Sequence, residues 1–145
     1  MTGLRRVLSA GAQPGVYRWR SADATDDVSR DVKAAGWGFV LLDTSGVGDK
    51  AGFLDACATA FDLPRWFGRN WDALADALGD RSTGEPEVVL WDSWQQLAES
   101  DLDALDVAVQ IFTEDANSTG QLRVLLRDPG GSDKLPPPIA DLPQL

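Results

Sequence analysis

The chain has 145 residues, of which 43% are apolar and 25% charged, and its 23 acidic and 13 basic residues give a net charge of −10. A chain of this length can bury a sufficient core as one domain without disulfides or metals. Its single cysteine, Cys57, excludes an internal disulfide. Because it contains no histidine, Ser-His-Asp and Cys-His catalysis and histidine-ligated zinc sites are excluded. We expect no enzyme, cofactor or metal site.

The first third of the chain is predicted to contain strand, helix and strand. Residues 16–20 alternate apolar and basic side chains, as a strand with one solvated face does. Residues 24–35 form a short helical pattern in which Thr25 can cap the amino terminus and Gly36 ends the helix. The continuous apolar run 39–42 is typical of a strand that is buried on both faces of a parallel sheet.

The remainder of the chain alternates helical patterns with short apolar runs. Helical spacing is found at 49–61, 70–79, 93–98 and 102–116, and further buried strands are predicted at 88–91 and 122–126. Cys57 lies on the apolar side of one of these helices, as a small buried hydrophobe would. Glycine and proline dominate after residue 128, where 136–138 is expected to form an extended polyproline segment. The order of elements predicts an α/β fold with a small parallel sheet and helical crossovers.

No apolar run approaches the length of a membrane span, and the amino terminus lacks the apolar stretch of a secretory signal. We therefore expect a cytoplasmic protein that does not associate with membranes. Residues 72–115 contain twelve acidic residues but only one basic residue, Arg81. Such a segment repels nucleic acid and attracts a basic partner, although plain solvation of an acidic surface would also account for it.

The most informative stretch is 64–78, a short aromatic loop that leads into a helix with two stripes. Trp71, Leu74 and Leu78 form an apolar stripe, whereas Asp72 and Asp76 stack at i and i+4 on the neighbouring face. Two like charges at this spacing cost a helix roughly 0.2–0.5 kcal/mol. The pattern therefore indicates that the two carboxylates face something cationic.

This stretch resembles the signature of the barstar family, intracellular inhibitors of guanyl-specific ribonucleases of the barnase type. Ten positions match in class within fifteen residues: Pro64, Trp66, Phe67, Gly68, Asn70, Asp72, Ala73, Leu74, Asp76 and Leu78. Weaker similarity covers 38–127. The resemblance implies three parallel strands with packed helices in a barstar-like domain over 38–127. The strand and helix of residues 1–37 are then an amino-terminal extension packed on that core, in which strand 16–20 is expected to extend the sheet at one edge. Residues 128–145 are expected to form a Gly/Pro-rich tail.

The resemblance also implies how the site works. The loop aromatic and the helix carboxylates plug the basic active site of the ribonuclease in a 1:1 complex, with the carboxylates in the place of substrate phosphate. Asp76 is the expected central phosphate mimic, Asp72 its neighbour, and Trp66 the aromatic anchor, while Phe67 is expected in the core. The residues implied to bind the partner are Trp66, Gly68, Asn70, Asp72, Asp76 and Glu114.

Two alternatives accompany these assignments. Asn70 slightly favours the role of helix cap over that of a partner contact, and Arg69 at i−3 could pair with Asp72. Arg65 and Arg69 replace acids of the familiar family pattern, so the target could be another basic toxin, with this chain as its immunity protein or binding module. An acid–base enzyme using Asp72, Asp76 or Glu114 has no further support in the sequence. We expect a monomer when the chain is free.

Overall fold

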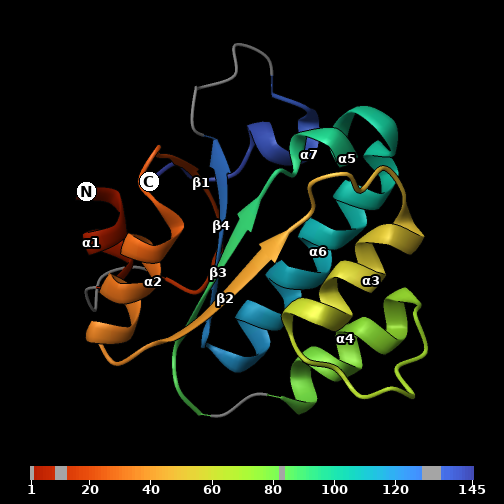
Figure 1. Cartoon of the computed structure of the whole chain (residues 1–145), viewed down its shortest axis with the longest axis horizontal. Helices are drawn as coiled ribbons and strands as arrows, with labels where there is room; N and C mark the ends of the chain where they lie inside the picture. The colour runs from red at the N-terminus through yellow and green to blue at the C-terminus, as the bar shows by residue number, and fades with distance from the viewer. Residues whose placement is uncertain (1, 9–12, 82–83, 129–134) are drawn as a thin grey trace.

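A computed structural model describes residues 2–8, 13–81, 84–128 and 135–145, which form an α/β fold around a parallel sheet (Figure 1). The strands are β1 (Gly15–Arg20), β2 (Gly38–Asp43), β3 (Glu87–Asp92) and β4 (Leu122–Asp128). They are ordered β1-β4-β3-β2, and every neighbouring pair is parallel. The predicted three-stranded core is confirmed, and the amino-terminal strand joins it at the β4 edge, so the sheet has four strands.

Helices α3 (Lys50–Ala60) and α6 (Leu102–Thr119) pack on one face of the sheet, and α4 (Trp71–Asp80) and α5 (Gln95–Ser100) pack against α6 on the same side. The centre of this layer is aromatic, because the ring of Phe53 lies 5.2 Å from Trp91 and 6.4 Å from Phe112. Cys57 is fully buried in the same cluster, as predicted, and burial raises the pKa of its thiol. Gly120 ends α6 with a φ of 71°, a left-handed conformation that glycine adopts without a Cβ penalty.

Two helices of the amino-terminal extension, α1 (Thr2–Leu8) and α2 (Thr25–Ala34), cover the opposite face (Figure 1). Val28 and Val32 of α2 are fully buried there against β3 and β4 residues. The apolar strands β3 and β4 are thus buried on both faces, as their composition predicts. The second core cluster consists of Leu4, Val7, Trp19, Val28, Val32, Val88, Leu90 and Leu125.

Arg127 at the end of β4 ties the extension to the core. Its guanidinium donates to both carboxylate oxygens of Asp92 at 2.8 Å, to the hydroxyl of Thr25 at 2.8 Å and to the carbonyl of Asp23. The prediction that Thr25 caps α2 is wrong, because the helix begins at Thr25 after an uncapped Ala24. The hydroxyl is instead used by Arg127, which is only 8% exposed.

The carboxyl-terminal tail is folded onto the sheet, so the extended polyproline segment predicted for 136–138 is correct only at its start. Pro136 is extended, but α7 (Pro137–Ala140) follows at once with proline in its first turn, where a missing N–H costs nothing. The helix forms there because it buries Ile139 completely in the larger core. Residues 143–145 then run along β1, with Arg18 N–H donating to Pro143 and Leu145 N–H donating to Arg18.

Strand β2 is the edge of the sheet opposite β1, and this position overturns one prediction. The run 39–42 was expected to be buried on both faces, yet Leu41 is 39% exposed. An edge strand has one strand neighbour, and α2 covers only part of its outer face. Among the described residues, no helix is long and apolar enough to cross a membrane.

Candidate protein-binding site

Asn70 joins the aromatic loop to α4 as the helix cap. Its side-chain oxygen accepts a hydrogen bond from the Ala73 N–H at 2.7 Å, and its amide donates to the Gly68 carbonyl at 3.2 Å. This satisfies one of the amide groups left free at a helix start. The capping role considered for Asn70 is confirmed, and the cap fixes the direction in which the loop leaves the helix.

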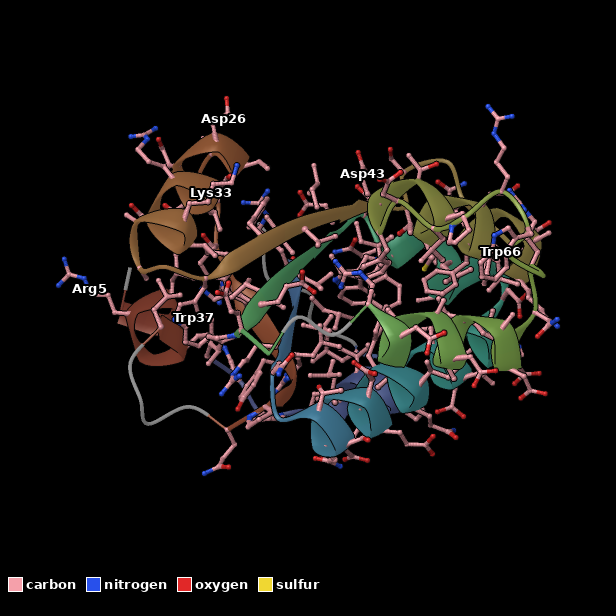
Figure 2. The ribbon with its side chains drawn as sticks, turned by 90° about the horizontal axis from the view of Figure 1, so that it is seen from below. Arg5, Asp26, Lys33, Trp37, Asp43 and Trp66 are labelled. Carbon is pink, nitrogen blue, oxygen red and sulfur yellow. The ribbon has the colours of Figure 1, made fainter. Side chains whose placement is uncertain are left out.

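The two aromatic residues of the loop point in opposite directions. Phe67 is 5% exposed and belongs to the core, whereas Trp66 is 83% exposed (Figure 2). A turn in which the Phe67 N–H donates to the Pro64 carbonyl at 2.9 Å holds them apart. The predicted division of roles, with Phe67 in the core, is therefore confirmed. A large aromatic side chain left in solvent is unusual for a residue type that gains so much from burial.

A groove with a volume of about 620 Å³ separates this loop from α4. Its lining is mainly apolar and includes four charged side chains. The alanines at i and i+4 of α4 contribute no bulk, which leaves the helix side of the groove open. The lining residues are Phe61, Asp62, Leu63, Pro64, Trp66, Phe67, Gly68, Ala73, Asp76, Ala77, Asp80 and Arg81.

The carboxylates of α4 are available to a partner. Asp72 and Asp76 are exposed, and neither forms an ion pair with any other residue that the structure describes. The suggested pairing of Asp72 with Arg69 is wrong, because the Arg69 guanidinium lies 2.6 Å from Asp55 and also donates to the Phe67 carbonyl. Arg69 adopts a φ of 45°, and this turn carries its side chain toward α3 and away from α4.

Arg81 lines the groove at the carboxyl-terminal end of α4. It forms two hydrogen bonds with Glu87, at 2.5 Å and 3.0 Å, and its guanidinium lies 4.9 Å from the centre of the Phe61 ring. The arginine therefore joins the end of α4 to the start of β3 and to the groove wall. Burial raises the pKa of the nearby Asp115 carboxyl, although the charge of Arg81 opposes this effect.

The structure brings together three of the six residues predicted to bind a partner: Trp66, Gly68 and Asp76 all line the groove. Asp72 lies one turn before Asp76 on the exposed side of α4, and Glu114 is exposed on α6, but neither lines the groove. Sequence reasoning missed Asp80, although its i+4 spacing from Asp76 continues the carboxylate stripe and could have revealed it.

The acidic segment 72–115 divides into structural and exposed groups. Glu87 pairs with Arg81, Asp92 pairs with Arg127, and the Asp101 side chain caps α6 by accepting from the Ala104 N–H. The exposed acids of the segment are Asp72, Asp76, Asp80, Glu85, Glu99, Asp103, Asp106 and Glu114. Most of the charge concentration noted in the sequence is thus on the surface.

Comparison with known proteins gives one family match. The family model described as Barstar (barnase inhibitor) matches residues 37–127, which is more than half of the chain. The matched segment runs from the start of β2 to the end of β4 and includes the aromatic loop and α4. No curated protein matches the sequence. The chain therefore belongs to the barstar family of barnase inhibitors.

Proposed function

We propose that this chain inhibits a guanyl-specific ribonuclease by inserting α4 and the preceding loop into the basic catalytic cleft of the enzyme. The block is steric and electrostatic, the complex is 1:1, and the inhibitor contributes no chemistry. The observation that carries the proposal is that the same groove is lined by Trp66, which is 83% exposed, and by Asp76, which has no ion-pair partner among the described residues.

Trp66 has the properties of an interface anchor. Tryptophan is enriched among the residues that dominate binding energies, and it reaches that role when a partner covers it fully. The rigid turn from Pro64 and the capped start of α4 hold its backbone on both sides. A preorganised aromatic loses little conformational freedom on binding, so the groove supports a partner that packs a side chain against the indole.

Asp76 supplies the charge that such a partner requires. A carboxylate accepts paired hydrogen bonds from an arginine as two phosphate oxygens do. Ribonuclease clefts hold cationic groups where the substrate phosphate binds, and an exposed carboxylate on a rigid helix meets them without rearrangement. Asp72 and Asp80, one turn away on either side, extend the negative surface along the helix.

Titration of the chain into a ribonuclease activity assay tests the proposal. Against a susceptible guanyl-specific enzyme, activity should fall linearly to zero at one equivalent of inhibitor. Asp76→Ala should weaken inhibition by at least tenfold, whereas Asp103→Ala, which removes an exposed acid from α6, should not. Equal effects of the two variants would show that general acidity, not the groove, is responsible.

A second candidate keeps the same site and changes the target. Arg65 is exposed directly beside Trp66, and Arg69 is held next to the loop by Asp55. These cations would meet the rim of the partner, where like charges are unfavourable. This favours a basic toxin other than barnase itself, for which the chain would serve as an immunity protein. Inhibition of toxins but of no secreted ribonuclease would select this candidate.

A further inference from the structure

The two edge strands of the sheet, β1 and β2, differ in whether another backbone segment pairs with their outer side. The outer side of β1 is covered by residues 143–145, which exchange backbone hydrogen bonds with Arg18 at 2.8 and 2.9 Å. Along the outer side of β2, no backbone partner is found within residues 13–81, 84–128 and 135–145. Exposed strand edges are templates for pairing with another chain, and most proteins cover them or place charges on them.

The hydrogen-bond pattern identifies which groups β2 presents outward. The Gly38 N–H donates to Pro86 and the Thr44 N–H to Asp92, so even-numbered residues face β3. Because successive residues of a strand alternate direction, the N–H and C=O groups of Phe39, Leu41 and Asp43 face outward. The central one, Leu41, is also one of three large apolar side chains exposed among the described residues.

The outward-facing backbone groups of these three residues are self-complementary. If a second β2 approaches in antiparallel orientation with Leu41 opposite its own copy, Phe39 lies opposite Asp43 on both sides of the two-fold axis. Each of these pairs has its N–H and C=O groups turned toward the partner and can share two backbone hydrogen bonds. The two Leu41 side chains meet on the same face of the joined sheet, which removes both from water.

Helix α2, which flanks β2, carries a matching charge pattern. Asp26 in its first turn and Lys33 in its last turn are exposed, and neither has an ion-pair partner among the described residues. They are separated by seven residues, or about 10 Å along the helix, and so share one side. A two-fold axis through Leu41 makes the two α2 helices antiparallel, so that Asp26 of each copy faces Lys33 of the other. Figure 2 shows Asp26, Lys33 and Asp43 along the same side of the molecule.

We infer that the β2 edge is a self-association surface, through which two copies of this chain join their sheets. The arrangement is isologous, since the same residues meet on both sides of the axis. One strand edge and one helix of each copy meet in this arrangement, and small interfaces are typical of weak complexes, so we expect a weak dimer that forms in concentrated solution. Trp66 lies at the other end of the molecule from Asp26 (Figure 2), and each copy keeps its groove open.

Sedimentation velocity of the full chain over a wide concentration range tests this inference. The wild-type protein should shift from monomer to dimer, and Leu41→Glu should remain monomeric. Leu102→Glu is the matched control, because Leu102 is also 39% exposed but lies on α6. This control should dimerise as the wild type does. Circular dichroism would verify that both variants keep their fold.

Exchange of charges tests the orientation of the two copies. Lys33→Asp should weaken the dimer by about tenfold or more, which corresponds to 1.4 kcal/mol, and adding Asp26→Lys should restore it. A wild-type chain that stays monomeric at its highest soluble concentration would overturn the inference, as would a dimer that survives Leu41→Glu. Because these readouts need no ribonuclease, they are independent of the inhibitor proposal.

Discussion

Replacement of Phe67 by alanine should mainly lower the stability of the fold, whereas replacement of the neighbouring Trp66 should mainly weaken binding. Phe67 is 5% exposed in the core, and Trp66 is 83% exposed at the groove. Phe67→Ala should destabilise the fold by about 3–5 kcal/mol, because it removes a large side chain and leaves a cavity. Trp66→Ala should leave the fold almost unchanged and should damage binding to the ribonuclease.

The exposure of Trp66 sets the sizes of both effects. A tryptophan can bury up to about 250 Å², and 83% exposure leaves roughly 40 Å² covered in the free protein, worth about 1 kcal/mol at most. The area still open to a partner is therefore roughly 200 Å², worth up to about 5 kcal/mol. Since association and desolvation costs reduce that gain, a loss of about 3 kcal/mol, or on the order of 150-fold in affinity, is expected.

Urea unfolding followed by circular dichroism gives the stabilities, and calorimetric titration with a susceptible ribonuclease gives the affinities. The reasoning predicts that Trp66→Ala unfolds at nearly the wild-type urea concentration and binds far more weakly. A Trp66→Ala variant with unchanged affinity would refute the role of the groove. A variant with a large loss of stability would instead show that the indole supports the fold.

Three further predictions concern charge. The association rate with the ribonuclease should fall tenfold or more between low and high salt in stopped-flow measurements, because exposed acids such as Asp72 and Asp76 steer a basic partner. An association rate that does not depend on salt would exclude electrostatic steering. Arg127→Met should cost about 3–5 kcal/mol in urea unfolding, because it leaves the half-buried Asp92 without its partner and releases Thr25. A change below about 1 kcal/mol would mean that the Arg127–Asp92 ion pair contributes little to stability. Burial raises the pKa of the Asp115 carboxyl in the fold, so the folded state binds the carboxyl proton more tightly than the unfolded chain does. The stability that this proton contributes is complete below the unfolded pKa of about 4, and it is lost as pH rises through the folded pKa. Asp115→Asn should therefore gain stability relative to wild type as pH is raised toward 7, and parallel pH profiles of the two proteins would contradict this assignment.

Local sequence patterns were sufficient to predict the core of the fold. The apolar runs that became β3 and β4 are buried on both faces, and the cap at Asn70 and the glycine stop at Gly120 lie where their chemistry requires. At these positions the signals act within a few residues of the chain. The exposed Leu41 departed from its pattern because burial at an edge strand depends on which element lies beside it.

The fold of the carboxyl-terminal tail and the contacts of Arg127 could not be predicted for a related reason. The helical turn at α7 exists because Ile139 reaches a core assembled from residues far away in the sequence. Thr25 has a side chain that is typical of a helix cap, but its hydroxyl accepts a hydrogen bond from Arg127, which lies 102 positions later. Long-range contacts override weak local preferences. At the candidate site, the sequence predicted that Trp66 and Asp76 bind a partner, but the groove that both residues line depends on how the loop folds back onto α4.

Calorimetric titration of the intact chain into a panel of guanyl-specific microbial ribonucleases tests the central claim most directly. The account predicts tight binding to at least one member at a stoichiometry of one, and a large loss of affinity for Asp76→Ala measured alongside. Absence of binding to every member, or binding that Asp76→Ala leaves intact, would contradict the proposal that α4 and its loop block a ribonuclease cleft.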